Sequence, residues 1–281
     1  MTIKQVIEKG AIMLKLENVE SPKLKARLLI QFILQKPRQY IIVHDMEELS
    51  LKKEKEYFKA IDLLKKGKPL EHITHQKEFM KLNFFVNEDV LIPRQDTETL
   101  VEEVIKLAKK SNAKNILDLC TGSGAIAVSL AKYLPNVKIT AIDISHKAIQ
   151  VAKKNAIYNH VENQIIFLES NLFENLSEQK YDIIVSNPPY ISWKELKKLD
   201  KQVKNEPVLA LDGGEDGLNF YRRIVSSAYE YLKYNGYLCF EIGYNQKQEV
   251  MNIIEKENKY VGTYCLKDLY DKDRVIVTKV N

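Results

Sequence analysis

The chain has few residues that could cross-link it or bind a metal. Its 281 residues include only three cysteines and five histidines. Cys120, Cys239 and Cys265 are odd in number and widely spaced, which argues against a disulfide framework and a cysteine zinc site. His72 and His75 form a close pair, but no third ligand stands at a suitable spacing. We therefore expect neither a disulfide bond nor a metal.

Long apolar runs are also missing. No segment approaches about 18 consecutive apolar residues, and the first five residues lack the apolar stretch of a signal peptide. The chain is 45% apolar, so it can bury a large core, and its length favours two domains. These features predict a cytoplasmic protein that does not associate with a membrane.

Most of the chain has no net charge. Residues 1–80 hold 16 Lys and Arg against 11 Asp and Glu, whereas residues 81–281 hold 27 of each kind. The positive excess of the N-terminal part could steer an acidic or RNA-associated partner, or it could be only the solvated faces of helices. A dedicated nucleic-acid binder would carry a stronger basic stripe. We expect no stable binding of nucleic acid.

The apolar pattern divides the chain into three parts. Residues 1–67 show helical periodicity, with Ser21 as the N-cap of one helix and Gly67 at the stop of a later one. Residues 68–92 form short alternating stretches, which predict a β-hairpin linker. Residues 93–281 alternate strands with helices, as expected for a catalytic domain.

Seven short segments of the third part are expected to be strands. They lie near residues 115–119, 138–142, 164–168, 181–185, 236–241, 260–265 and 273–279. Their alternation with helices predicts an α/β fold with a doubly wound, mostly parallel, seven-stranded sheet. Ligands bind such sheets at the carboxyl ends of the strands.

The most informative motif directly follows one of these strands. It consists of Asn187, Pro188, Pro189 and Tyr190. The prolines stiffen the turn and have no N–H, so the Asn187 side-chain oxygen and the Pro188 carbonyl can accept both hydrogens of one planar NH2 group. Tyr190 can stack on the flat face of that group, which leaves the nitrogen lone pair directed at an electrophile such as a sulfonium. The alternative is an ordinary turn.

A second motif joins a strand to a helix through a glycine-rich turn. Its residues are Cys120, Thr121, Gly122, Ser123 and Gly124. The two glycines let the backbone approach a ligand closely, as in nucleotide-binding units. The third glycine of the dinucleotide fingerprint is missing, which disfavours a nicotinamide cofactor.

An acidic residue ends the next predicted strand. Asp143 lies about 20 residues past the glycines, where a carboxylate can accept hydrogen bonds from the two hydroxyls of a ribose. The alternative is that Asp143 caps the helix that begins near Ser145.

Together, the two motifs and the acid resemble the class I S-adenosylmethionine-dependent methyltransferases that modify planar nitrogens. The resemblance implies S-adenosylmethionine as cofactor, with residues 120–124 at its methionine part and Asp143 at its ribose. It also implies that Asn187, Pro188 and Tyr190 act in catalysis, that residues 187–190 bind the substrate, and that Asn187 contacts the cofactor. Adenine, guanine and glutamine all offer a flat NH2 group, so these residues alone do not choose among them.

Further segments narrow the resemblance to the HemK/PrmC family of peptide chain release factor glutamine methyltransferases. These segments are residues 79–82, 86–94, 97–98, 206–207, 210–218, 240–243 and 273–275. The resemblance implies methylation of the glutamine amide nitrogen in the Gly-Gly-Gln motif of release factors 1 and 2. Residues 1–67 are then expected to dock this protein substrate, and we expect a monomer.

The chain departs from the family pattern around the adenine of the cofactor. Asn171 and Leu172 stand where the family often has Asp and Trp. Asn171 can still accept or donate a hydrogen bond at the adenine edge, and Leu172 offers apolar contact instead of stacking. Cys120 also stands where glycine is frequent. Both Asn171 and Leu172 are nevertheless expected at the cofactor.

Two other functions stay open at this point. An adenine or guanine methyltransferase acting on DNA or RNA could use the same turn, but it would have to flip or splay its base. No recognition domain is visible beyond about 80 helical residues at the N-terminus. A non-catalytic, cofactor-binding activator subunit is the second alternative, and the intact Asn-Pro-Pro-Tyr motif argues against it.

Overall fold

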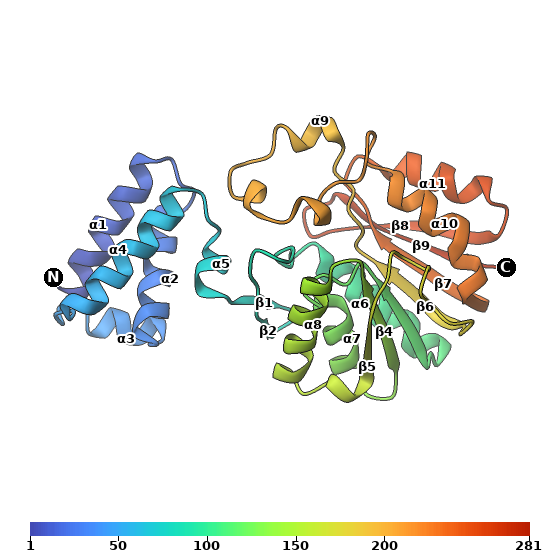
Figure 1. Cartoon of the computed structure of the whole chain (residues 1–281), viewed down its shortest axis with the longest axis horizontal. Coiled ribbons are helices and arrows are strands. Elements are labelled where there is room, and N and C mark those ends of the chain that lie inside the picture. Colours follow the sequence, from blue (N-terminus) through green and yellow to red (C-terminus); the bar gives the residue numbers. More distant parts are fainter. The chain divides into compact units, whose positions relative to one another are not determined.

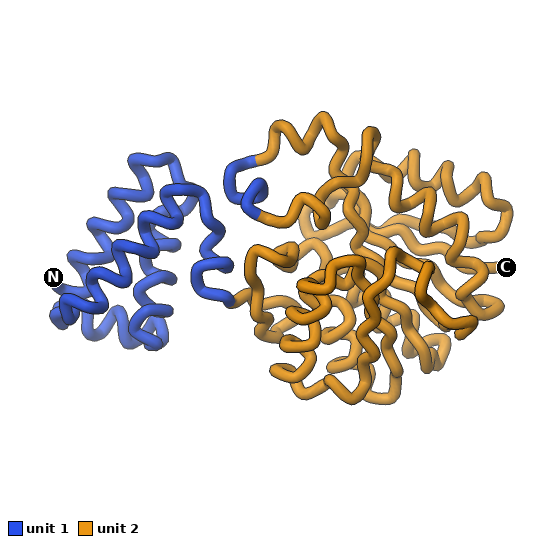
Figure 2. The backbone as a smooth tube through the Cα atoms, viewed as in Figure 1, with its two compact units in different colours: residues 1–75, 200–205 blue, residues 76–199, 206–281 orange.

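The computed structural model describes the whole chain, from Met1 to Asn281, and divides it into two compact units. One unit comprises residues 1–75 and 200–205, and the other comprises residues 76–199 and 206–281 (Figure 2). No helix in either unit combines the length and the apolar character needed to cross a bilayer.

The first unit is a small helical bundle. Its helices are α1 (Ile3–Leu16), α2 (Pro22–Leu34), α3 (Arg38–Val43), α4 (Leu51–Lys65) and α5 (Leu70–Thr74) (Figure 1). Helices α1, α2 and α4 pack against one another. Their buried apolar residues, which include Val6, Leu29 and Ile61, form one core.

The ends of α2 and α4 can be compared with their sequence signals. Ser50 caps α4 by accepting a hydrogen bond from Lys53 N, and Gly67 ends the helix in the left-handed region at φ +93°. Ser21 stands at the N-cap of α2, as expected, and Pro22 follows as the first helical residue, but the Ser21 side chain makes no capping hydrogen bond. Ser21 has φ 50° and ψ 50°, in the left-handed region, whereas a capping residue usually has an extended backbone.

A short hairpin opens the second unit. Strands β1 (Lys77–Phe79) and β2 (Leu82–Phe84) pair antiparallel, and Met80 and Lys81 form the turn with positive φ angles. The expected linker over residues 68–92 therefore contains the helix α5 before its hairpin, and α5 belongs to the helical unit. Helix formation in residues 70–74 was not visible in the short alternating pattern.

A seven-stranded sheet forms the centre of the second unit, as expected. Its strands are β3 (Asn115–Leu119), β4 (Lys138–Asp143), β5 (Ile165–Glu169), β6 (Tyr181–Ser186), β7 (Leu232–Glu241), β8 (Tyr260–Lys267) and β9 (Asp273–Val280). Their order is β5-β4-β3-β6-β7-β9-β8, and β9 runs in the opposite direction to the other six strands. The chain order reverses between β3 and β6, which makes their carboxyl ends the place for a ligand.

Helices cover both faces of this sheet (Figure 1). They are α6 (Thr97–Ser111), α7 (Ala125–Tyr133), α8 (His146–Tyr158), α10 (Asn219–Tyr231) and α11 (Lys247–Lys256), with a short α9 (Trp193–Leu196). Ile116 of β3 packs with α6 and α7, and the next residue, Leu117, packs with α10 and α11. Successive strand residues thus serve two cores, as the alternation of strand side chains requires. Three 3-10 turns complete the chain at Glu162–Gln164, Val203–Asn205 and Val208–Ala210.

One close approach in the helical unit yields a stability prediction. Gly10 of α1 faces Tyr57 of α4, whose buried hydroxyl donates to the Ala26 carbonyl at 3.2 Å. A Cβ atom added at Gly10 would clash with that hydroxyl and lie 2.9 Å from two ring carbons. Gly10→Ala should therefore lower the free energy of unfolding of this unit by about 1–3 kcal/mol. The higher helix propensity of Ala, about 1 kcal/mol, works against this loss.

Hydrogen exchange of the α1 and α4 amides in the full chain would measure this change. The exposed position Lys4→Ala, in the same helix, serves as a control that should leave the exchange rates nearly unchanged. Tyr57→Phe combined with Gly10→Ala should cost less than the sum of the two single changes, because it removes the clashing atom. Exchange rates in Gly10→Ala equal to those of the wild type would show that α1 and α4 have room for a methyl group.

Candidate active site

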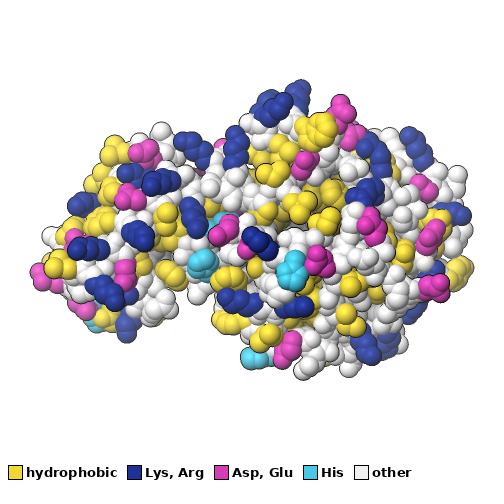
Figure 3. All heavy atoms as spheres, viewed as in Figure 1, with side chains coloured by type: hydrophobic (Ala, Val, Ile, Leu, Met, Phe, Trp, Pro, Cys, Tyr) yellow, Lys and Arg dark blue, Asp and Glu magenta, His cyan; other side chains and the backbone are white.

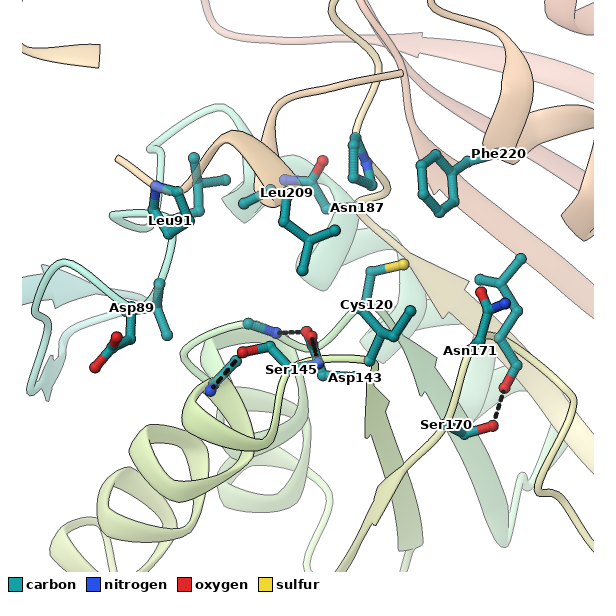
Figure 4. Close-up of a pocket in the computed structure, with 18 of the residues that line it drawn as sticks. Asp89, Leu91, Cys120, Asp143, Ser145, Ser170, Asn171, Asn187, Leu209 and Phe220 are labelled. Carbon is teal, nitrogen blue, oxygen red and sulfur yellow. Dashed lines mark hydrogen bonds between the residues drawn. The ribbon is translucent and has the colours of Figure 1, made fainter. Parts of the chain in front are cut away.

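A cavity of about 340 Å³ lies at the carboxyl ends of β3, β4, β5 and β6. Figure 4 shows Cys120 in the middle of its lining, with Asn187 and Phe220 on one side and Asp143 on the other. The cavity brings together seven of the residues predicted from the sequence: Cys120, Gly122, Asp143, Asn171, Leu172, Asn187 and Pro189. Five others do not line it: Thr121, Ser123, Gly124, Pro188 and Tyr190.

The glycine-rich turn presents some residues to the cavity and uses others to hold itself in place. Gly122 has φ 55°, and a Cβ atom added there would meet nothing within 4 Å. Its backbone is therefore open to a ligand. Gly124 is packed instead, since an added Cβ atom would lie 3.0 Å from Ala152 of α8. Thr121 donates to buried Asp118 at 2.6 Å, and the Ser123 carbonyl accepts from Asn155 at 2.8 Å.

Cys120 is in the left-handed region at φ 59°, a conformation that glycine adopts most easily. Burial raises the pKa of its thiol, and the carboxyl groups of Asp143 and Asp118 raise it further. The thiol therefore stays protonated at neutral pH and is not a nucleophile. Its role is that of a small side chain in the wall of the cavity.

Asp143 connects the glycine-rich turn to the start of α8. One carboxylate oxygen accepts from Gly122 N at 2.8 Å, and the other accepts from Ser145 N at 2.9 Å. Ser145, and not Asp143, is the N-cap of α8, because its hydroxyl accepts from Ala148 N. Burial raises the pKa of the Asp143 carboxyl. Each oxygen still has a lone pair available to a ligand in the cavity.

The predicted adenine region is occupied by a small polar network. Asn171 accepts from Arg223 at 2.8 Å and donates to Glu174 at 2.6 Å, so both ends of its amide have partners. Leu172 is nearly buried and packs into the core with α10. Arg223 and Phe220 line the cavity from α10. Sequence reasoning missed both, because an amphipathic helix gives no sign of which residue reaches a site on the neighbouring strands.

The Asn-Pro-Pro-Tyr turn is held by residues from distant parts of the chain. Asn187 Nδ2 donates to the Thr97 hydroxyl at 3.2 Å, and the Thr97 hydroxyl donates to Glu241 Oε2 at 2.5 Å. The Tyr190 hydroxyl donates to the other oxygen, Glu241 Oε1, at 3.3 Å. Pro188 and Pro189 are buried. The Asn187 Oδ1 atom keeps its lone pairs for a ligand.

Glu241 ends β7 as a carboxyl group that is only 1% exposed. Burial raises its pKa to about 7, while hydrogen bonds from Thr97 and Tyr190 and the charge of Arg274 act in the opposite direction. Sequence reasoning assigned no role to Thr97 or Glu241. The available signal was a charged residue at the end of the apolar stretch 236–240, which calls for a partner.

The other side of the turn is held by Gln246, at the N-cap of α11, and by the loop that contains Gly213. Gln246 Nε2 donates to the Tyr190 carbonyl at 3.0 Å, and a Cβ atom added to Gly213 would lie 2.7 Å from Tyr190 Cα. The Gln246 hydrogen bond and the close contact at Gly213 therefore fix the position of Tyr190. Ahead of Gly213 in the same loop, buried Glu206 forms an ion pair with Arg94 at 2.5 Å.

Known families match two parts of the chain. Residues 5–74 match the PrmC N-terminal domain, and residues 95–206 match the Methyltransferase small domain. The fold agrees with solved structures at low identity. The hMettl16 catalytic domain gives a TM-score of 0.57 at 16% identity over 82% of this chain and 81% of that one. The ribosomal protein L11 methylase of Lactobacillus delbrueckii subsp. bulgaricus gives 0.51 at 18% identity over 70% and 84%.

Other relatives are much closer in sequence. The chain is 42% identical to the release factor glutamine methyltransferase of Clostridium acetobutylicum, over 99% of this chain and 98% of that protein. It is also 42% identical to the protein of that name from Fusobacterium nucleatum, over 98% and 78%. A bifunctional methyltransferase of Rickettsia felis is 38% identical, and the match covers 98% of this chain and 58% of that protein.

S-adenosylmethionine is the cofactor of this methyltransferase domain. The cavity fits that molecule, because an open glycine backbone, a carboxylate and apolar side chains meet at the point where the strand order reverses. With near-full-length relatives at 42% identity and a matching N-terminal domain, the chain belongs to the release factor glutamine methyltransferase family.

Proposed function

We propose that this protein methylates the side-chain amide nitrogen of the glutamine in the Gly-Gly-Gln motif of peptide chain release factors 1 and 2. It thereby modulates translation termination in the cytoplasm. The observation that carries this proposal is the orientation of the Asn187 amide, whose Nδ2 is bound to Thr97 so that Oδ1 remains an acceptor. An acceptor at this place suits an incoming NH2 group.

The cavity residues divide between cofactor and substrate. The backbone at Cys120 and Gly122, in the turn of residues 120–124, holds the methionine part of S-adenosylmethionine, Asp143 holds the ribose, and Asn171 and Leu172 lie toward the adenine. Bound there, the cofactor supplies an electrophilic methyl group. Phe220 adds an apolar surface on the α10 side of the cavity. All these groups come from one chain, in keeping with a monomeric enzyme.

Asn187 and Pro188 position the substrate nitrogen. The Asn187 Oδ1 atom and the Pro188 carbonyl accept its two hydrogens, and Tyr190 lies against the amide plane. Pro189 fixes the turn that carries them. The amide nitrogen is held with its lone pair toward the methyl group, so catalysis comes from position and from polar stabilisation of the developing charge. None of these four residues supplies a base, so the proton that the amide nitrogen must lose when the methyl group leaves the cofactor sulfur would pass to solvent.

The same acceptors could hold the exocyclic amine of adenine or guanine, which keeps a nucleic-acid methyltransferase as the alternative. The balanced charge of residues 81–281 does not favour a polyanion at the catalytic domain. We propose that the protein forms no stable complex with nucleic acid. A non-catalytic activator would need no Asn187 amide directed into the cavity.

The helical unit is proposed to dock the release factor. Three exposed lysines, Lys52, Lys55 and Lys59, follow one face of α4 at helical spacing, and we call them the α4 lysine face. Lys53 is not part of it, because its ammonium donates to the Ile33 carbonyl at 2.8 Å. Figure 3 shows basic and apolar side chains interspersed over this unit. Such a surface can guide an acidic partner and then bind it.

The function is tested by methyl transfer from labelled S-adenosylmethionine to purified release factors. Wild-type release factor should be labelled, and a release factor with alanine in place of the Gly-Gly-Gln glutamine should not. Asn187→Ala of the enzyme should bind the cofactor but lose about 10²-fold or more in turnover, because one preorganised contact is gone. Labelling of the alanine release factor, or faster labelling of DNA, ribosomal RNA or transfer RNA, would favour the nucleic-acid alternative.

A second prediction concerns the cofactor. Asp143→Ala should weaken S-adenosylmethionine binding at least about tenfold, since each hydrogen bond to a charged acceptor contributes roughly 1.5–3 kcal/mol. Calorimetric titration measures this affinity. Asp182→Ala is a matched control, because Asp182 also accepts from two backbone amides, those of Lys114 and Asn115. These residues lie at the amino ends of the strands, opposite the cavity. Equal affinities in the two variants would limit Asp143 to holding the turn.

A third prediction concerns the α4 lysine face. Changing its three lysines to Glu should slow association with the release factor and raise KM while leaving kcat unchanged. The difference should shrink at high salt, because exposed charges are screened over about 8 Å at 0.15 M. The control changes three exposed lysines of the catalytic unit, Lys109, Lys110 and Lys114, which alters net charge equally. Identical kinetics for both triple variants would mean that docking depends on shape and apolar contact.

A further inference from the structure

Two hydrogen bonds connect the substrate-facing amide of Asn187 to the buried carboxylate of Glu241, and a third joins Tyr190 to the same carboxylate. They run from Asn187 Nδ2 to Thr97 Oγ1 at 3.2 Å, from Thr97 Oγ1 to Glu241 Oε2 at 2.5 Å, and from Tyr190 Oη to Glu241 Oε1 at 3.3 Å. Thr97 is the first residue of α6, and Glu241 is the last residue of β7. Both partners therefore belong to rigid elements and not to the turn itself.

The direction of these bonds determines which end of the Asn187 amide faces the cavity. A hydroxyl group has one hydrogen, and Thr97 gives it to Glu241, which as a carboxylate can only accept. The remaining lone pairs of Thr97 Oγ1 then require a donor. Only the NH2 end of the Asn187 amide provides one, so the planar amide must present Oδ1 on its other side.

We infer that Thr97 and Glu241 are positioning residues that set the polarity of the Asn187 amide, so that its oxygen and not its nitrogen meets the NH2 group to be methylated. With the amide reversed, two donors would face each other, and the contact that holds the nucleophile would be lost. This inference rests on the proposed function, because it concerns the same acceptor site.

The burial of Glu241 is consistent with such a role. Both of its oxygens are bound by residues that belong to the catalytic turn or contact it, and its desolvation is costly unless every lone pair is used. Arg274 contributes a compensating charge, but its guanidinium donates to Asp268 at 3.0 Å and lies 3.2 Å from Asp96. A carboxylate needed only to join α6 to β7 would not require Tyr190 as well.

Thr97→Val and Thr97→Ser test the inference directly. Valine keeps the shape of threonine but removes the hydroxyl, so kcat for the release factor should fall about 10- to 100-fold. Serine keeps the hydroxyl and should retain kcat within about threefold. Cofactor affinity is measured in parallel and should differ little between the two variants, whereas the melting temperature of Thr97→Val should be lower because buried Glu241 loses a donor; kcat is therefore compared at a temperature at which both variants are folded. Equal kcat in wild type and Thr97→Val, or equal losses in both variants, would overturn the inference.

A double-mutant cycle separates positioning from packing. In the Asn187→Ala background, Thr97→Val should lower the residual rate no further, because the group on which it acts is gone. Glu241→Gln should behave like Thr97→Val, since one amide cannot accept from both the Thr97 and the Tyr190 hydroxyls. The double variant of Thr97 and Glu241 should be about as slow as either single variant. Multiplicative losses in these cycles would overturn the inference.

The pH profile supplies a readout that packing would not change. Burial raises the pKa of Glu241 to about 7, and the charged or titratable groups around it are Arg274, Asp96, Tyr190 and Tyr221. Below that pH the protonated carboxyl can donate to Thr97, which frees the Thr97 hydrogen for Asn187 and reverses the amide. Wild-type kcat should therefore fall as pH drops through about 7. This limb should be absent in Glu241→Gln, and its persistence there would contradict the inference.

Hydrogen exchange of the Asn187 side-chain amide tests the inference without any substrate. One of its two protons should exchange slowly at pH 8 because it is bound to Thr97, and both should exchange quickly in Thr97→Val. The signals are identified by their loss in Asn187→Ala. If the wild type methylated no release factor, the proposed function would fail while this result could still stand. Unchanged slow exchange in Thr97→Val would sink the inference by itself.

Discussion

The parallel pairing of β3 with β6 determines where both motifs lie. Its register places Leu119 beside Ser186, and the Ser186 hydroxyl donates to the Leu119 carbonyl at 2.9 Å. The next residues, Cys120 and Asn187, leave the sheet at its point of reversal, and both line the cavity. A shift of one residue in this register would turn every strand side chain to the opposite core. The hydrophobic cores of the catalytic unit therefore also specify the relative positions of cofactor and substrate.

Buried carboxyl groups hold the loops at the carboxyl ends of the strands. Asp118 accepts from Thr121, Asp143 accepts from Gly122 N and Ser145 N, and Glu241 accepts from Thr97 and Tyr190. Burial raises the pKa of Asp118 and Glu241 to about 7 in each case. Burying each of these acids costs more free energy than burying an apolar residue. Each acid lies where a loop must stay in one position. Polar contacts thus add specificity where the two cores end.

Contiguous features could be predicted from the sequence, and features that depend on distant partners could not. Central strands such as β6 are visible because they are short apolar runs buried on both faces, and residues 187–190 form one uninterrupted motif. The start of β7 at Leu232, four residues before the expected 236, is hidden by polar residues that follow α10 directly. Thr97 and Glu241 are 144 residues apart, and no local pattern relates them. The role of Ser21 depended on a backbone angle that its neighbours do not determine.

At the substrate end of the site, function depends on which atoms donate and which accept hydrogen bonds. No charged group contacts the substrate nitrogen there. An amide has almost the same shape in both orientations, so packing alone cannot choose between Oδ1 and Nδ2 of Asn187. A carboxylate accepts hydrogen bonds and never donates, so the Thr97 hydroxyl must donate to Glu241. The Thr97 oxygen can then only accept, and Asn187 must donate to it through Nδ2. Substitutions that keep volume but exchange a donor for an acceptor should therefore harm this site more than small changes of size. The cost of burying Glu241 follows from that requirement.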